Sequence, residues 1–275
     1  MPSTTMSSTT TPSAARLLAL LALLAAACSD DEGTVPPADA GPADAAPADA
    51  GSPDAGAPLC EATTVPCVDE SIALLDLFDT VNAAEIREEG TTPGEFTTFV
   101  DATAGGMMPT TSFVYARFTD TGLVGAALSD EDALLSTDWD IAFRRYVLRV
   151  NSGVAGPSCV QAARTAPGTT FEGLTAVPDG VAYRTESYLT DTCEIVPDGN
   201  GLGSPATALS SFWSYPGCVA MTGNVYVLAL RGGRHVKLEV VGYYAPANQA
   251  SCDSGGSVTL PSGSGSVRVR WSFLD

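Results

Sequence analysis

The chain of 275 residues has little positive charge: it contains one histidine and one lysine, Lys237. Its 13 arginines and lysines stand against 32 aspartates and glutamates, so the formal net charge is -19. A nucleic-acid-binding surface needs clustered positive charge, and so does electrostatic attachment to anionic lipid. The composition therefore argues against both kinds of partner and predicts a solvated acidic surface.

The sequence also lacks an apolar run long enough to span a bilayer. Residues 17–27 (LLALLALLAAA) have the length of the hydrophobic segment of a signal peptide. The run ends in small residues directly before Cys28, which is similar to a bacterial lipobox. We predict a signal peptide over residues 1–27 and lipid attachment at Cys28, anchoring the protein outside the cytoplasm at the outer membrane or cell surface of a bacterium. The alternative is an ordinary signal peptide that is cut after Ala27.

The seven cysteines include no CxxC pair, so a compact zinc site is not indicated. Without Cys28 an even number remains, which in a secreted chain predicts three disulfides. These six are Cys60, Cys67, Cys159, Cys193, Cys218 and Cys252. Their order and spacing favour the pairs Cys60–Cys67, Cys159–Cys193 and Cys218–Cys252.

Residues 28–58 are dominated by proline, alanine and aspartate, with aspartates at positions 39, 44, 49 and 54. Proline and repelling charge keep such a segment extended, and it offers no apolar residues for a core. We therefore predict a linker over residues 28–58, followed by one folded domain over residues 59–275.

Short strands separated by glycine- and proline-rich turns dominate the predicted domain. The clearest signal is a β-hairpin with arms 225–230 and 235–244 around the turn Arg231-Gly232-Gly233-Arg234. Further strands are predicted at 96–100, 113–118, 123–128, 181–189 and 266–274, while residues 72–81 fit either a short helix or a strand. No long amphipathic helix is present, so we predict a single antiparallel all-β domain.

The densest run of aromatic, β-branched and charged residues is 137–153 (TDWDIAFRRYVLRVNSG). Trp139, Ile141 and Phe143 share one phase of a two-residue alternation, whereas Leu148 and Val150 follow the opposite phase. A phase slip within one strand is typical of a β-bulge, so we expect a bulged strand here. We also expect Asp138 and Asp140 to pair with Arg144, Arg145 or Arg149.

The same run resembles the signature of the HmuY family of secreted or lipid-anchored β-rich proteins. The resemblance extends to residues 100–118, to the hairpin with Tyr243-Tyr244, and to the terminal strand 267–273, covering about residues 96–274 in order. It implies an HmuY-like β-rich domain and, from the founding members, haem binding through a pair of histidines. This chain has one histidine, so a bis-histidine site cannot form.

The remaining candidates for axial haem ligands are Met107, Met108 and His235. Met107 and Met108 lie in a glycine-rich loop, and thioether sulfur is an established axial donor. His235 falls on the outward-facing set of the predicted hairpin, where an exposed surface histidine is the simpler interpretation. Haem is the one cofactor considered, and no metal site and no catalytic residues are predicted.

Catalysis is disfavoured because the single histidine has no GxSxG motif or free cysteine to activate. Paired carboxylates among Asp138, Asp140, Glu172 and Glu186 remain open as a weak alternative. Two hypotheses lead. The first is a surface-anchored lipoprotein that binds haem or another tetrapyrrole, with haem or a haem-carrying protein or receptor as its partner. The second is a non-haem surface interaction module on the same scaffold.

Overall fold

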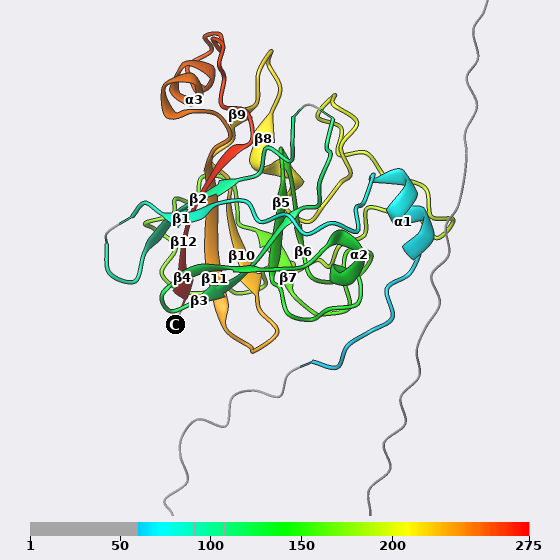
Figure 1. Ribbon diagram of the computed structural model, residues 1–275. Helices are drawn as coiled ribbons and strands as arrows, with labels where there is room; N and C mark the ends of the chain where they lie inside the picture. Colours follow the sequence, from blue (N-terminus) through cyan, green and yellow to red (C-terminus); the bar gives the residue numbers. More distant parts are fainter. Residues whose placement is uncertain (1–59, 91, 107, 275) are drawn as a thin grey trace, which may run out of the picture. The chain divides into compact units, whose positions relative to one another are not determined.

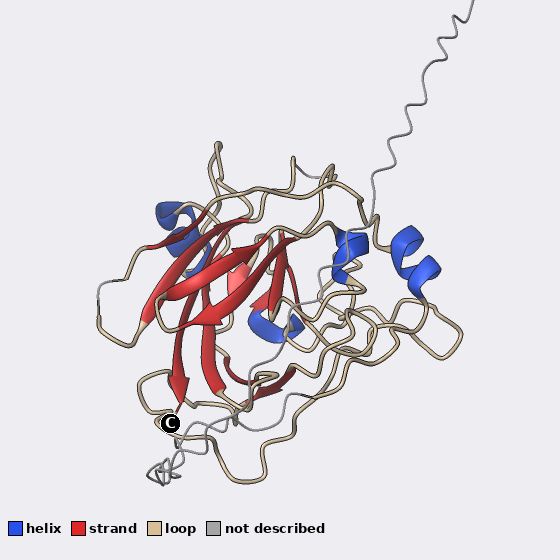
Figure 2. Ribbon diagram, turned by 60° about the horizontal axis from the view of Figure 1, so that its bottom comes forward, coloured by secondary structure: helices blue, strands red, loops and turns tan. Residues whose placement is uncertain are grey.

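The computed structural model describes residues 60–90, 92–106 and 108–274. The predicted signal peptide, Cys28 and the linker lie outside these residues. Within them antiparallel sheets dominate and the helices are short, so the all-β prediction is confirmed (Figures 1 and 2). No helix in this part of the chain is both long and apolar enough to cross a membrane.

A six-stranded sheet has the order β1-β2-β12-β11-β10-β7, with every neighbouring pair antiparallel. Its strands are β1 (Ile86–Glu88), β2 (Phe96–Asp101), β7 (Gln161–Arg164), β10 (Val225–Ala229), β11 (His235–Gly242) and β12 (Ser266–Leu274). The predicted hairpin is present as β10 and β11, with Tyr226 opposite Leu238. Its turn closes through a hydrogen bond from the Leu230 amide to the Arg234 carbonyl, 2.9 Å long.

A second sheet has the order β4-β3-β5-β6, and β8 and β9 form a separate two-stranded sheet. These strands are β3 (Val114–Thr119), β4 (Gly122–Ala126), β5 (Ile141–Arg144), β6 (Val147–Val150), β8 (Trp213–Ser214) and β9 (Ala220–Met221). The helical elements are α1 (Val68–Leu74), α2 (Asp130–Ala133), α3 (Pro246–Asp253) and the 3-10 turn η1 (Ser210–Phe212). The strand predicted at 181–189 is wrong, since Arg184 and Leu189 form only isolated bridges.

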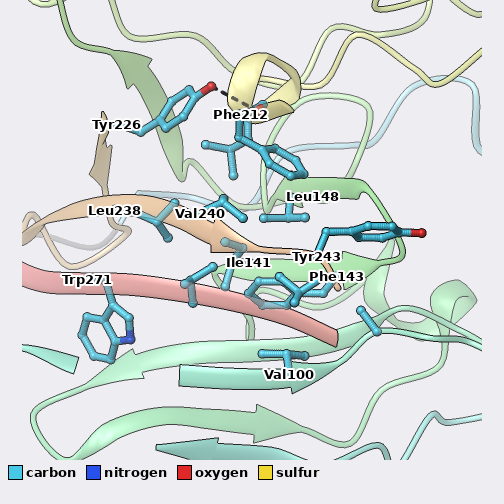
Figure 3. Packing of buried hydrophobic residues seen from close by; sticks show 14 of the residues in the cluster. Val100, Ile141, Phe143, Leu148, Phe212, Tyr226, Leu238, Val240, Tyr243 and Trp271 are labelled. Atoms are coloured by element: carbon cyan, nitrogen blue, oxygen red, sulfur yellow. Dashed lines mark hydrogen bonds between the residues drawn. The ribbon is translucent and has the colours of Figure 1, made fainter. Parts of the chain in front are cut away.

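The main core lies between the inner faces of the six- and four-stranded sheets (Figure 3). From β12 and β11 it takes Trp271, Leu238 and Val240, and from β5 it takes Ile141 and Phe143, all at most 1% exposed. These side chains lie together in the core because every second residue of a strand points to the same face of its sheet. Burying a side chain of this size stabilises a fold by about 1.5–3 kcal/mol, so these residues contribute a large part of the stability of the sandwich.

The expected bulge in residues 137–153 is wrong, because this run is a β-hairpin. β5 and β6 are antiparallel neighbours joined by Arg145-Tyr146, and Phe143 lies opposite Leu148. The numbers of two residues that face each other across a two-residue turn differ by an odd number. If the residues of one arm that point to the core are odd-numbered, those of the other arm are even-numbered, so the apolar phase flips between the arms. The phase slip was therefore the signature of a turn.

The outer face of the four-stranded sheet carries a buried ionic cluster centred on Asp130, which is fully buried at the start of α2. Its carboxylate lies 3.5 Å from Arg144 Nη1 and 3.7 Å from Arg149 Nη2, and it accepts a hydrogen bond of 2.7 Å from the Tyr115 hydroxyl. The expected pairing of these arginines with Asp138 or Asp140 is therefore wrong. The partner comes from the first residue of α2, which precedes β5.

Candidate ligand-binding site

A hollow of about 310 Å³ opens at the end of the sandwich where β11 finishes and β5 turns into β6. Four tyrosines and one arginine give it its chemistry. The residues around it are Arg145, Tyr146, Leu202, Tyr215, Val219, Tyr243, Tyr244, Val258, Ser262 and Ser264. Among these described lining residues there is no histidine, cysteine or carboxylate, so the surface is aromatic, hydroxylic and positively charged.

The aromatic rings in and beside the hollow form a continuous chain. The Tyr146 ring centroid lies 5.2 Å from that of Trp213 and 6.0 Å from that of Tyr243. Tyr243 in turn meets Tyr244 edge to face, at 4.8 Å and 73°. Spacings of 4.5–7 Å are those of favourable aromatic pairs. Packing against one another holds these rings in fixed positions before any ligand arrives.

Arg145 sits at the rim in the left-handed region, with φ 53°. This conformation costs a residue with a Cβ about 1–2 kcal/mol. The cost is offset by contacts to the neighbouring loop: the Arg145 amide donates to Ala102 O at 2.7 Å, and Nη1 donates to Gly106 O at 2.8 Å. Gly106 belongs to the glycine-rich loop that contains Met108, which places that loop beside the hollow.

Helix α3 holds the backbone of Tyr243 and Tyr244 in place. Both backbone amides donate to Oε1 of Gln249, at 2.8 and 3.1 Å, and Gln249 is itself buried. The disulfide Cys218–Cys252 links α3 to the segment before β9. The Val219 amide, next to that disulfide, donates to the Tyr244 hydroxyl at 3.1 Å. Helix, disulfide and strand end therefore brace one wall of the hollow.

The pKa of Tyr243 is raised by burial, and Arg145 partly opposes that shift because its positive charge favours the phenolate. Figure 3 shows the ring lying at the edge of the core with its hydroxyl directed away from the packed apolar side chains. The hydroxyl is thus presented to the hollow as a neutral phenol beside the positive charge of Arg145.

The three predicted axial ligands do not come together. Met107 lies outside the described residues, while Met108 is 75% exposed on the loop that touches Arg145. His235 begins β11, whereas the hollow lies beyond its other end, eight residues or about 26 Å along the strand. The His235 ring instead lies 6.1 Å from that of Tyr183. A site shared by His235 and the methionine loop is not formed in this structure.

Three disulfides are present, but two of the expected pairings are wrong. Cys60 bonds to Cys159 and Cys67 bonds to Cys193, while the expected pair Cys218–Cys252 is correct. The first two bridges span 99 and 126 residues. They tie the start of the domain to loops that cover the outer face of the four-stranded sheet. Since Cys67 and Cys193 are joined, their proximity to Glu70 does not provide thiolates for a metal.

Asp140 and Glu186, which belong to the glycosidase-type alternative, are buried and accept hydrogen bonds from backbone amides. Asp140 accepts from the Phe118 amide at 3.0 Å, and burial raises the pKa of Asp140 to about 6. Glu186 accepts from the amides of Val150 and Ala208 at 2.9 and 2.8 Å, and burial raises the pKa of Glu186 to about 7. Both oxygens of Glu186 are therefore engaged in joining loops to β6.

A larger and more polar hollow, about 510 Å³, lies between the loop 165–172 and the outer face of the six-stranded sheet. Its threonines are engaged internally: the Thr165 hydroxyl donates to Val225 O at 2.9 Å, and that of Thr222 donates to Ser211 O at 2.8 Å. Glu172 is paired with Arg270 at 2.5 Å. Polar groups that satisfy each other leave this groove less suited to an apolar ligand than the tyrosine-lined hollow.

The tyrosines are the functional residues that the sequence did not single out. In the sequence, Tyr243-Tyr244 is marked only by the family resemblance. The usable signal was the position of aromatic residues directly after predicted strand ends, where side chains leave the core but stay near it. Their gathering around one hollow requires the tertiary fold.

Comparisons with known proteins find no match among protein-family models and none among curated proteins. Among solved structures, the chain is similar to a protein from Bacteroides vulgatus described as HmuY-like, with 18% identity over 68% of this chain and 97% of that one and a TM-score of 0.44. It is also similar to the apo form of an HmuY analog from Tannerella forsythia, with 14% identity, coverage of 72% and 100%, and a TM-score of 0.37. Apo PinO from Porphyromonas gingivitis gives 14% identity, coverage of 70% and 98%, and a TM-score of 0.36.

The predicted resemblance to HmuY-like proteins is thus confirmed over about 70% of the chain. At these identities and TM-scores the likeness assigns no ligand and no site. The side chains of this chain have to supply that argument.

Proposed function

We propose that this protein is a ligand-binding lipoprotein, anchored through Cys28 outside the cytoplasm, that holds haem or a related tetrapyrrole in the tyrosine-lined hollow. The observation that carries the proposal is the gathering of Tyr146, Tyr215, Tyr243 and Tyr244 around one opening with Arg145 at its rim. The hollow contains binding groups and no nucleophile with a base, which favours binding over catalysis.

Each part of the hollow matches a part of such a ligand. Tyrosine faces stack on a flat conjugated ring while their hydroxyls stay near water. The Arg145 guanidinium suits a carboxylate side chain of the ring, because charge-assisted hydrogen bonds of this kind are the strong ones. Ligand pockets run from about 300 to 1,000 Å³, so the hollow is at the small end and would cover part of one face of a macrocycle. Tyr215, 46% exposed, would flank the remainder.

Haem iron also needs an axial donor. Met108 is the predicted donor nearest to the hollow, because its loop is held against Arg145 through Gly106. His235 stays a separate prediction, and iron bound there would lie at the far end of the six-stranded sheet. When bound, haem would supply absorbance and redox chemistry; this chain would supply orientation and exclusion of water.

Titration of haemin into the detergent-purified full chain is expected to give a shifted and saturable Soret band. Arg145→Gly keeps the left-handed turn while deleting the guanidinium, and we expect about tenfold weaker binding from the loss of one charge-assisted contact. The matched control is Arg234→Gly, in the turn at the opposite end of β11, where an exposed Arg234 pairs with Asp120 and lies over the Phe273 ring. This control should bind like the parent.

The same titration distinguishes between the predicted donors Met108 and His235. Met108→Ala removes an exposed side chain and His235→Ala removes the only imidazole, so neither should disturb folding. Loss of the Soret shift in His235→Ala with normal binding in Arg145→Gly would place the ligand away from the hollow and overturn the proposed site. A featureless titration of the parent would leave the second hypothesis, a non-haem interaction module.

Anchoring is tested independently of the ligand. Cys28→Ser should move the protein from the membrane fraction to the soluble extracytoplasmic fraction, because a lipid chain is the attachment that the lipobox-like sequence provides. Ser29→Ala is the neighbouring control and should remain in the membrane fraction. Unchanged fractionation of Cys28→Ser would contradict lipidation at this cysteine.

A further inference from the structure

The tyrosines of the hollow are not equivalent, and one of them is built differently from the rest. The Tyr244 hydroxyl already accepts a hydrogen bond from the Val219 amide. Tyr215 is exposed, and Tyr146 is half-buried on a two-residue turn. Tyr243 is 2% exposed, so its ring is fixed in the core while its hydroxyl reaches the hollow.

Two polar neighbours of the Tyr243 hydroxyl act in the same direction. The Arg145 guanidinium and the Ser264 hydroxyl both favour the phenolate, whereas burial of the ring favours the neutral phenol and dominates, so the pKa is raised. A metal ion reverses this balance, because a coordinated acidic group is deprotonated by the charge of the ion. Arg145 and Ser264 therefore offset part of the cost of a metal-bound phenolate, while Tyr146 and Tyr244 act in the opposite direction.

We infer that Tyr243 ligates the iron of the bound tetrapyrrole through its phenolate oxygen, and that the site therefore selects ferric over ferrous haem. The inference rests on the proposed function. Tyrosine is an established axial ligand of haem iron. An anionic oxygen is a hard donor and stabilises the more highly charged ion. On binding, the phenolic proton passes to solvent and the oxygen–iron bond forms without any change of oxidation state.

The position of Tyr243 supports a ligand role more than a stacking role. Tyr243 is 2% exposed and its ring packs against those of Tyr146 and Tyr244, which leaves little of the ring free to stack on a ligand. Its backbone is held on both sides, with the amide donating to Gln249 Oε1 at 2.8 Å and the carbonyl accepting from the Gly265 amide at 3.0 Å. A rigid ring with one oxygen at the ligand side meets the need for a preorganised donor.

The test compares haemin with metal-free protoporphyrin IX on the full chain. Tyr243→Phe should weaken haemin binding at least about tenfold, since losing even a supporting contact to a metal typically costs 10–100-fold. It should leave protoporphyrin binding within about twofold, the scatter of a variant that loses no direct ligand contact. Tyr226→Phe is the matched control: Tyr226 is equally buried, donates to Leu209 O at 3.3 Å, and lies outside the hollow.

A second measurement does not depend on any variant folding. Resonance Raman spectra of the parent's ferric complex should contain iron-bound phenolate vibrations, and reduction with dithionite should weaken binding. Equal affinity of the parent for haemin and protoporphyrin, with no phenolate bands, would overturn the inference and leave the proposed function standing. Failure of both porphyrins to bind would overturn the proposed function and the inference with it.

Discussion

Asp130→Ala is expected to lower the free energy of unfolding by about 3–5 kcal/mol, the cost of breaking a buried ion pair by removing one partner. Asp130 is fully buried and faces Arg144 and Arg149, whose side chains are 8% and 1% exposed. Removing the carboxylate leaves two guanidiniums in the interior without a counter-charge. Nε of Arg149 already has no hydrogen-bond partner, so the cluster has no spare acceptor to compensate.

The Asp130 carboxylate also connects two segments of the backbone. Its oxygens accept from the amides of Phe78 and Phe113, at 3.1 and 2.9 Å, and so connect the segment after α1 to the start of β3. Burial lowers the pKa of Arg144 to about 10 even though Asp130 opposes that shift. Without Asp130 the charged form of Arg144 becomes still less favourable. Because both arginines keep their charge at neutral pH, we expect the loss of folding stability to be large there.

Denaturant unfolding followed by fluorescence of the buried tryptophans measures the effect. Glu131→Ala, on the adjoining exposed position of α2, is the control and should change stability by less than about 0.5 kcal/mol. Asp130→Asn separates charge from shape: it keeps a hydrogen-bond acceptor, so a loss as large as that of alanine would assign the effect to charge. A loss below about 1 kcal/mol for both variants would contradict the ion-pair account.

The strands that could be predicted are those whose own sequence alternates clearly between apolar and polar residues. The arms of β10 and β11 alternate and are joined by Gly232-Gly233, so the hairpin could be located from local sequence alone. β12 was equally clear because its inner set is apolar throughout. In 181–189 the same alternation was present without strand partners, so local pattern did not decide the outcome.

Predictions that depended on partners distant in the sequence failed for a physical reason. Arg144 and Arg149 lie on the outer side of their hairpin, facing α2, so their carboxylate is Asp130 and not Asp138 or Asp140. Nothing in the local alternation shows which side of a sheet is covered. The hollow follows the same logic, because Tyr146, Tyr215 and Tyr243 become neighbours only after the sheets pack.

The cysteine pairings show that sequence distance is a poor guide when a domain has two covered faces. Short spacing favoured Cys60–Cys67, yet each cysteine instead reaches a loop far along the chain. The expected pair Cys218–Cys252 forms because β9 and α3 contact each other directly. The difference has energetic consequences, since a bridge that closes a longer loop restricts the unfolded chain more.

Removing the long bridge with Cys67→Ser and Cys193→Ser together should therefore cost more stability than removing the short one. On the chain-entropy account, a loop of 126 residues gives about 5 kcal/mol and one of 34 residues gives about 4 kcal/mol. Paired denaturant unfolding of the two double variants measures this order. The reverse order would show that native contacts, and not loop closure, determine what each bridge contributes.

The two bridges should have the opposite order of effects on ligand binding: removing Cys218–Cys252 should weaken binding more than removing Cys67–Cys193. Cys218–Cys252 holds α3, whose Gln249 fixes the amides of Tyr243 and Tyr244, so Cys218→Ser with Cys252→Ser should loosen the wall of the hollow and weaken haemin binding. The Cys67–Cys193 bridge fastens α1 over the outer face of the other sheet, and neither cysteine lines the hollow. The variant that loses more stability should then keep the parent's affinity, as measured below its unfolding transition. Equal loss of affinity in both would mean that the hollow depends on the stability of the whole domain instead of on its local bracing.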